Sequence, residues 1–453
     1  MGRTDARSHA MRPTLATSRE FLAAAVVIVV VGCAVILKYR WIVTRIDIVS
    51  AILAAGALWY SFRLADPAPM TDENLRRDEL LSQFAVFVLF LVFYSITAGS
   101  DVSPYDAHVR QAFAFIHGHT YIEAPYYIEH AQVGPYSYQL HPILPAILLM
   151  PFVAIWGMST NQNYFSIIVG ALDIALAWRL LGRFRISLNA RKWLTLFFGV
   201  GTIIWYETIN GGSWGVSMVV AILVTLLALD ETFDQARPAV VGSFAAAAGL
   251  ARYDLVFVWP IYLALLLFWR RRTIRELFWF LPGCAVTAVI YVTFNFVRYH
   301  SPFDRGVIYY MPKDQQTLFA FRFFPGNFFT LFFMAPGLGG GFPYIHPQFG
   351  GQSILTTSPA FLLALKASCR RIENALIALG ALIAVTPSLF YVGNGSAQFG
   401  TRHYLQAFPF LLILMALGVH RRLDQMSRVL ITVSVFMIIW GVWYVRFWGL
   451  GGS

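Results

Sequence analysis

The chain has 453 residues, of which 58% are hydrophobic and only 13% charged, and its mean hydropathy is +0.62. Because soluble domains carry about a quarter charged residues, this composition excludes an ordinary soluble protein. The net charge of +11 does not indicate nucleic-acid binding, because the arginines stand in short connections between apolar segments, where the positive-inside rule expects cytoplasmic loops.

Apolar runs recur along the chain, most of them close to the roughly 20 residues that a helix needs to cross a bilayer. They cover residues 20–37, 47–63, 80–98, 163–180, 193–208, 216–229, 255–269, 277–296, 374–391, 404–419 and 429–447. We therefore predict one all-α, multi-pass membrane domain over residues 1–453, with about 11–14 transmembrane helices.

Two external segments follow if the arginine clusters are cytoplasmic. Residues 99–142 form a first external loop, and residues 297–350 form a second large external segment. Residues 239–269 are expected to form a hairpin with its tip outside. The arginines of 179–192 conflict with this scheme unless the proline-bearing run 141–157 fails to span fully, or unless the arginine rule misleads locally.

The first loop contains a predicted surface helix. Ser103, Pro104 and Asp106 resemble a helix start, with serine as N-cap, proline at the first position and an acid at the third. An apolar stripe follows at helical spacing, which predicts an amphipathic helix on the outer membrane surface. The stripe consists of Val109, Ala112, Phe113 and Ile116.

The two aspartates at the start of this loop are not equivalent. Asp106 can cap its helix and can pair with Arg110 four residues later. Asp101 lies at the mouth of a membrane helix with no cationic neighbour in sequence, and ionisable residues at such positions are functional hypotheses by default.

Histidines are also concentrated in the loop, and they raise the question of a metal site. His117, His119, His108, His130 and His141 show no spacing typical of zinc or manganese motifs. We therefore do not favour a metal and predict no cofactor. We interpret these histidines and the neighbouring tyrosines as interfacial residues, with stacking of the tyrosines on an acceptor or sugar as the alternative.

The loop and the segments after it resemble bacterial GT-C glycosyltransferases. The resemblance begins with SPYDAHVRQAFAFIHGHTYI, continues in HPILPAILLMPFVAIWG, and recurs from about residue 100 to 420. The later segments are GLARYD (249–254), NFVRYHSPFDRGV (295–307), FPYIHPQFGGQSILTTSPAFLLAL (342–365) and GNGSAQFGTRHYLQAFPFLLILMALG (393–418). This sequence departs from the family in having two additional apolar runs before the loop and in lacking the paired Asp-Glu of some members.

The resemblance implies an inverting glycosyltransferase in the bacterial inner membrane. It would move a sugar from a polyprenyl-phosphate donor to an acceptor hydroxyl on the external face. The general base maps onto Asp101 or Asp106. Candidates for binding the departing phosphate are Arg402, His403, Arg298, Arg252 and Lys313. Candidates for binding the acceptor or the sugar are Tyr105, Arg110, Glu129 and His141.

Other functions stay open from the sequence alone. A transporter or flippase would bury ionisable residues at mid-membrane, often within inverted repeats. Here the charges gather in external loops and no repeat is visible, which favours the transferase. A membrane acyltransferase, or a glycan ligase with a lipid-linked oligosaccharide donor, is a further alternative. The acceptor, whether lipid, glycan or protein, is not indicated.

Overall fold

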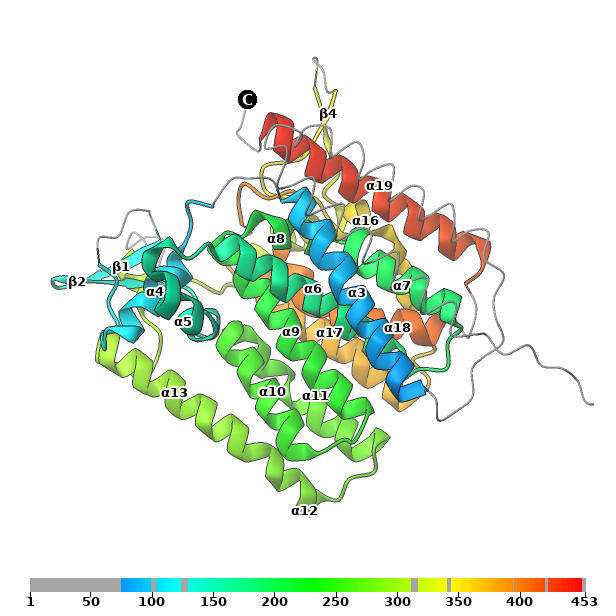
Figure 1. Ribbon diagram of the computed structural model, residues 1–453, viewed down its shortest axis with the longest axis horizontal. Helices are drawn as coiled ribbons and strands as arrows, with labels where there is room; N and C mark the ends of the chain where they lie inside the picture. The colour runs from blue at the N-terminus through cyan, green and yellow to red at the C-terminus, as the bar shows by residue number, and fades with distance from the viewer. Residues whose placement is uncertain are drawn as a thin grey trace, which may run out of the picture.

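The computed structural model is a bundle of helices with two small β-hairpins at its rim (Figure 1). It describes residues 75–98, 103–123, 129–310, 317–339, 344–393, 395–419 and 423–449. Two predicted site residues, Asp101 and Lys313, lie outside the described residues, as do the apolar runs 20–37 and 47–63.

The centre of the bundle is formed by α6 (Gln162–Leu181) and α9 (Ser213–Phe233), which pack against each other. α3 (Leu75–Thr97) covers α6 on one side, and α10 (Pro238–Ala251) covers α9 on the other. In the apolar window of α9, 89% of the residues are buried. This central position explains why α9 is apolar on all sides rather than amphipathic.

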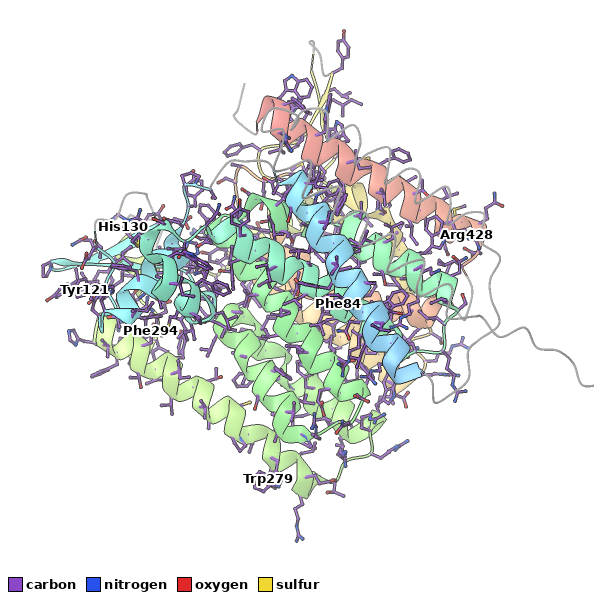
Figure 2. All side chains as sticks on the ribbon, in the orientation of Figure 1. Phe84, Tyr121, His130, Trp279, Phe294 and Arg428 are labelled. Atoms are coloured by element: carbon purple, nitrogen blue, oxygen red, sulfur yellow. The ribbon has the colours of Figure 1, made fainter. Side chains whose placement is uncertain are left out.

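Six helical segments among the described residues are long and apolar enough to cross a membrane, as the prediction of a mostly helical membrane protein requires. They are Glu79–Thr97, Gln162–Leu181, Ser213–Phe233, Ile274–Tyr299, Ile372–Phe390 and Gln425–Trp448. Figure 2 labels Trp279 and Phe294 toward the two ends of the fourth segment, which lies on the outside of the bundle.

Three apolar runs that were expected to be continuous are broken in the structure. Run 193–208 divides into α7 (Leu188–Val200) and α8 (Ile204–Asn210). Runs 255–269 and 404–419 each contain a 3-10 helix followed by a short α-helix with proline in its first turn. Proline is suited to the first helical turn because it lacks an N–H, and 3-10 turns are common at helix starts.

The remaining elements are short or lie at the periphery. The first loop contains α4 (Ala107–Ile116), β1 (His130–Val133), β2 (Tyr136–Gln139) and α5 (Leu144–Trp156). The later ones are η2 (Tyr253–Val258), α11 (Trp259–Ala264), η3 (Leu265–Trp269), α12 (Ile274–Leu277), α13 (Leu281–Tyr299), α14 (Gly306–Tyr310), α15 (Phe324–Phe333), β3 (Gly337–Leu338), β4 (Ile345–His346), α16 (Ile354–Thr357), η7 (Pro359–Lys366), α17 (Ile372–Phe390), η8 (Arg402–Ala407), α18 (Phe408–Gly418) and α19 (Gln425–Trp448).

The helix predicted in the first loop exists, but it starts three residues late. Asp106 is its N-cap residue and makes no side-chain capping bond, whereas serine was expected in that role. The buried face also differs from the predicted stripe, because His108 and Gln111 are fully buried while Ile116 is 38% exposed. α4 packs against α5, so protein contacts decide which of its faces is covered.

The proline-bearing run 141–157 is too short to cross a bilayer by itself. Its helix α5 has 13 residues, which corresponds to about 20 Å, whereas the hydrocarbon core is about 30 Å thick.

At the other end of the bundle, Arg191 Nη1 donates to Glu79 Oε2 at 2.9 Å. This ion pair joins the start of α7 to the start of α3, so the arginines of 179–192 lie at the end of the bundle opposite the first loop.

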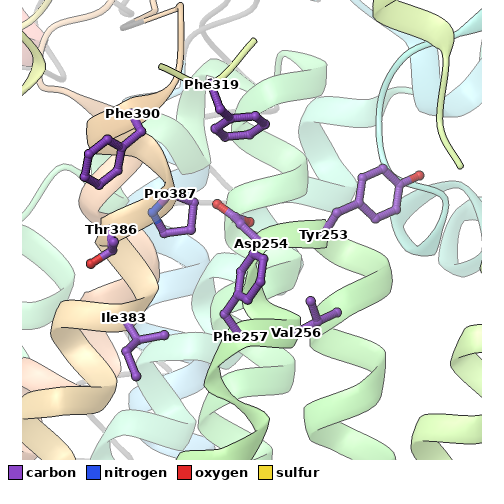
Figure 3. A pocket seen from close by; sticks show the side chains of 9 residues that line it. All are labelled: Tyr253, Asp254, Val256, Phe257, Phe319, Ile383, Thr386, Pro387 and Phe390. Carbon is purple, nitrogen blue, oxygen red and sulfur yellow. The ribbon is translucent and has the colours of Figure 1, made fainter. Parts of the chain in front are cut away.

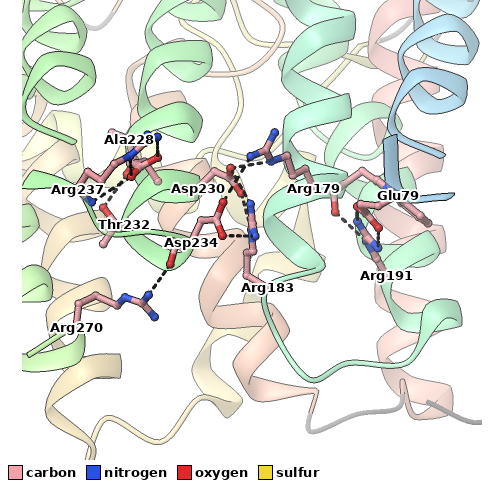
Figure 4. A network of polar contacts seen from close by, with 12 residues as sticks. Glu79, Arg179, Arg183, Arg191, Ala228, Asp230, Thr232, Asp234, Arg237 and Arg270 are labelled. Carbon is pink, nitrogen blue, oxygen red and sulfur yellow. Dashed lines mark hydrogen bonds and ion pairs between the residues drawn. The ribbon is translucent and has the colours of Figure 1, made fainter. Parts of the chain in front are cut away.

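The arginines at this end are paired with acids (Figure 4). Arg179 and Arg183 both contact Asp230, with Nε–Oδ distances of 2.8 and 2.9 Å, and Arg183 Nη1 lies 2.8 Å from Asp234. Arg237 pairs with Glu231 at 2.8 Å. The pairs join α6 to the end of α9, so most of this positive charge is neutralised within the fold.

We expect opposite sides of the membrane for the first loop and this arginine network. In a chain whose Cys33, Cys284 and Cys369 are serine, Glu123→Cys should react with a membrane-impermeant maleimide in intact cells. Arg185→Cys should react only after permeabilisation. Both native side chains are exposed, so access rather than burial controls the labelling. Reaction of both from the same side would contradict the arrangement.

Candidate functional site

The start of the first loop is attached to the first turn of α9. The backbone oxygen of Tyr105 accepts hydrogen bonds from the Ser213 N–H (3.1 Å), the Ser213 hydroxyl (2.6 Å) and the Gln162 amide (3.1 Å). The Ser213 hydroxyl also accepts a bond from the Ala107 N–H at 2.9 Å, which satisfies a free N–H at the start of α4. This junction holds the loop against α6 and α9.

The end of the loop lies over Trp214, the second residue of α9. The Trp214 indole N–H donates to Glu129 Oε2 at 2.8 Å, and His141 Nε2 lies 3.6 Å from the same oxygen. The His141 ring lies edge-on to the Trp214 ring at 5.7 Å and contacts the His108 ring at 5.4 Å. Glu129 and His141, both predicted to bind acceptor or sugar, are therefore brought together.

Two arginines from separate turns lie beside these residues. Arg402 begins η8, and its Cζ lies 5.4 Å from the centroid of the Trp214 ring, which is a cation–π distance. Within the described part of the chain, the Arg402 guanidinium group makes no hydrogen bond or ion pair. Arg252 ends α10 with an extended backbone, and its Nη2 lies 3.3 Å from Asp254 Oδ2.

Asp254 connects the arginines to an apolar groove (Figure 3). Its Oδ2 also accepts a hydrogen bond from Gln406 Nε2 at 2.8 Å, which joins η2 to η8. The groove has a volume of about 540 Å³. Its lining residues are Tyr253, Asp254, Val256, Phe257, Phe319, Ile383, Thr386, Pro387 and Phe390. Figure 3 shows the Asp254 carboxylate near Phe319 and Pro387, with Phe257 and Ile383 farther along the helices.

We refer to these residues together as the polar cluster. Its members come from the first loop and from the starts or ends of separate helices, and they lie at the end of the bundle opposite the arginine network. They are Glu129, His141, Trp214, Arg252, Asp254, Arg402 and His403.

Burial keeps the imidazoles of this region neutral. The pKa of His108 is lowered to about 4 by burial. The pKa of His141 is lowered well below its usual value by burial and further by His108, Arg402 and Arg252. Burial, Arg252 and Arg402 have the same effect on the pKa of His403. The positive charge of the site therefore comes from its two arginines, because a nearby cation opposes imidazole protonation.

Glu129 is held in a mixed environment. Burial raises its pKa, whereas the Trp214 hydrogen bond and the nearby Arg402 charge lower it. A carboxylate with a raised pKa accepts a proton more readily than an exposed one, which is the property of a general base. Glu129 is therefore the first-loop carboxylate whose environment in the described residues suits proton transfer.

Glu207 is a buried acid near the site that the sequence analysis did not select. It lies in α8, is 1% exposed, and its Oε1 has no hydrogen-bond partner among the described residues. The sequence could have indicated Glu207, because it is the one acid inside the apolar run 193–208 and such residues are functional candidates.

Of the other predicted residues that the structure describes, Asp106, Arg110 and Arg298 bond to residues outside the polar cluster, whereas Tyr105 contacts Trp214. Asp106 pairs with Arg110 at 2.9 Å, as the spacing predicted. Tyr105 contributes its backbone oxygen to the junction with α9, and its ring lies 4.9 Å from that of Trp214. Arg298 binds the backbone oxygen of Gln139 on β2 rather than a member of the cluster. The roles predicted for Asp101 and Lys313 stay predictions.

Metal binding finds no geometric support in the described residues. No group of three or more His, Cys, Asp or Glu residues in them is arranged to hold an ion. His117 and His119 each bond to a backbone oxygen through Nδ1, at 2.8 Å in both cases.

Comparison with known proteins adds no identity to this geometry. The chain matches no family model, and no curated protein matches it in sequence. The site is therefore interpreted from its own residues.

Proposed function

We propose that this chain is an inverting glycosyltransferase of the GT-C type, multi-pass in the bacterial cytoplasmic membrane, with its site on the external face. The donor is a polyprenyl-phosphate-linked sugar. One arrangement carries the proposal: Asp254 lines an apolar groove and pairs with Arg252, and Glu129 and Arg402 both contact the nearby Trp214 side chain. A lipid phosphate that carries a sugar needs these three kinds of surface together.

The phosphate of the donor is bound by Arg252 and Arg402. The charge of Arg252 is partly balanced by Asp254 at 3.3 Å, whereas the Arg402 guanidinium group has no carboxylate within ion-pair distance among the described residues. Guanidinium groups bind phosphate oxygens through paired N–H donors. Their positive charge stabilises the negative charge that the phosphate gains as it leaves.

The apolar tail of the donor lies in the groove between η2 and α17. The groove follows α17 from Ile383 to Phe390, a length of about 10 Å, which accommodates the isoprene units nearest the phosphate. Phe257 and Phe319 are each 59% exposed at its wall. Phe319, which lines the groove, belongs to the Phe-rich segment 319–333.

The reaction needs one base and one leaving group. The acceptor hydroxyl loses its proton to a first-loop carboxylate as its oxygen bonds to the anomeric carbon from the face opposite the phosphate. The bond between that carbon and the phosphate oxygen breaks, and the polyprenyl phosphate leaves with the electron pair. Among the described carboxylates of the loop, Glu129 is the one that contacts the polar cluster.

One observation favours the alternative of a transporter. Asp173 is fully buried in the middle of α6, and neither of its carboxylate oxygens has a hydrogen-bond partner among the described residues. Buried ionisable residues at such depth often belong to ion or substrate pathways. A transferase with an external site does not use this residue, so its substitution separates the two functions.

Three variants identify the base. In an assay with a panel of polyprenyl-phosphate hexoses and pentoses, Glu129→Gln should lower kcat by about 10²- to 10⁴-fold with donor binding retained. Asp106→Asn should change kcat by only a few-fold, because that aspartate is paired with Arg110. A large loss in Asp101→Asn with full activity in Glu129→Gln would assign the base to Asp101 instead.

Substitution of the arginines tests the phosphate site. Arg402→Gln and Arg252→Gln should each lower kcat/KM by about 10²- to 10³-fold, because a charge-stabilising donor is lost. The exposed Arg305→Gln is the matched control. Asp173→Asn should keep transferase activity. Activity that survives both arginine substitutions and disappears in Asp173→Asn would contradict the proposal and favour transport.

A further inference from the structure

A second buried polar region lies beside the polar cluster and is centred on Arg298. This arginine, in the last turn of α13, is 1% exposed. Its Nη1 donates to Gln139 O at 3.0 Å and its Nη2 to Asn295 Oδ1 at 2.7 Å. Among the described residues, the nearest carboxylate oxygen is on Asp304, 4.0 Å away. A buried guanidinium group with so distant a counter-charge is unusual.

Several buried polar atoms near Arg298 have no hydrogen-bond partner among the described residues. They are both side-chain atoms of Gln139 and the hydroxyls of Tyr253 and Tyr299. Gln139 and Tyr299 are 1% and 4% exposed, and Tyr253 and Tyr299 both lie within the electrostatic influence of Arg298 and Asp304. Buried polar groups are nearly always bonded, so this region provides donors and acceptors for a ligand.

A row of aromatic rings leads from the surface to this region. The tyrosine row consists of Tyr121, Tyr136, Tyr138, Tyr299 and Tyr309. Successive ring centroids are 4.7, 6.5, 5.8 and 5.9 Å apart. Tyr136 and Tyr309 are 45% and 43% exposed, whereas Tyr138 and Tyr299 between them are buried. The Arg298 Cζ lies 4.6 Å from the centroid of the Tyr299 ring.

An interfacial aromatic belt does not explain this arrangement. Belt residues lie at one depth with their polar ends in water, whereas the tyrosine row has two buried rings in its middle, and one of them, Tyr299, lies against the Arg298 guanidinium group. Aromatic faces pack against the C–H faces of sugar rings, while hydroxyl, amide and guanidinium groups bond to sugar hydroxyls. The combination is suited to a carbohydrate.

The region is placed where an acceptor would be needed. Arg252 and Asp254 belong to the polar cluster, whereas the phenol of Tyr253 between them points away from the other groove residues (Figure 3). Its ring lies 5.1 Å from that of Tyr291 on α13. Figure 2 shows Tyr121, His130 and Phe294 on this side of the molecule. The two regions are therefore neighbours on opposite sides of residue 253.

We propose that the tyrosine row and the Arg298 region bind a neutral oligosaccharide as the acceptor. The assignment of this ligand as the acceptor rests on the proposed transferase function, whereas the binding of an oligosaccharide does not. Asp304 partly balances Arg298, which favours an uncharged, hydroxyl-rich ligand over an anion. The donor phosphate then belongs to Arg252 and Arg402, and Arg298 serves the acceptor.

Direct binding tests this proposal with the full chain in phospholipid nanodiscs. Mannotetraose, cellotetraose and arabinotetraose are the probes, measured by saturation-transfer NMR and by titration calorimetry. At least one probe should bind, and Tyr121→Ala and Tyr136→Ala should weaken it at least tenfold. Tyr164→Ala, an exposed tyrosine on α6 outside the row, should not change binding. Thermal unfolding should be unchanged in all three variants because these side chains are partly or largely exposed.

The outcomes separate this inference from the proposed function. Binding of no probe, or binding that is equal in the row variants and in Tyr164→Ala, overturns the carbohydrate site. Glu129→Gln should abolish transfer while it leaves probe binding intact. If Tyr121→Ala and Tyr136→Ala lose probe binding but keep full transfer activity, the acceptor role is overturned although the surface binds sugar. Arg298→Lys should weaken binding at least tenfold, and unchanged binding would remove Arg298 from the site.

Discussion

The attachment of the first loop to α9 is the interaction on which the arrangement of the site depends. One backbone oxygen, on Tyr105, accepts three hydrogen bonds from Ser213 and Gln162. In a mostly apolar chain, buried N–H and C=O groups need such partners because lipid provides none. The loop that begins at this junction returns to α9 at Trp214, which bonds to Glu129. The need to satisfy backbone hydrogen bonds at this junction thereby places the Glu129 carboxylate beside the start of α9.

The pairing of charged side chains differs between the two ends of the bundle. At one end, Arg179, Arg183 and Arg237 have carboxylates at 2.8–2.9 Å, so these arginines are held in structural ion pairs. At the other end, Arg402 lacks such a partner among the described residues, and Arg298 has one only at 4.0 Å. Incompletely balanced charge in partly buried surroundings is typical of binding sites rather than of structural ion pairs.

Interrupted helices bring the site residues together. Arg252 stands where α10 ends and η2 begins, and Arg402 begins η8 before the proline-bearing start of α18. At these breaks the backbone leaves the regular helix, so side chains can point across the end of the bundle instead of along it. The Gln406–Asp254 bond at 2.8 Å holds the two breaks in register. The same breaks divide runs that the hydropathy pattern presents as continuous.

The sequence by itself determined the helical membrane class, the segments rich in ionisable groups and the Asp106–Arg110 pair, because these follow from composition and spacing along the chain. It also selected Glu129, His141, Arg252 and Arg402 as candidates. Only the tertiary structure decided that these four lie together and that Arg298 lies on the other side of Tyr253. It also revealed the buried Glu207, the groove beside α17 and the late start of α4. These features depend on contacts between residues that are far apart in sequence, and neither periodicity nor hydropathy contains information on such contacts.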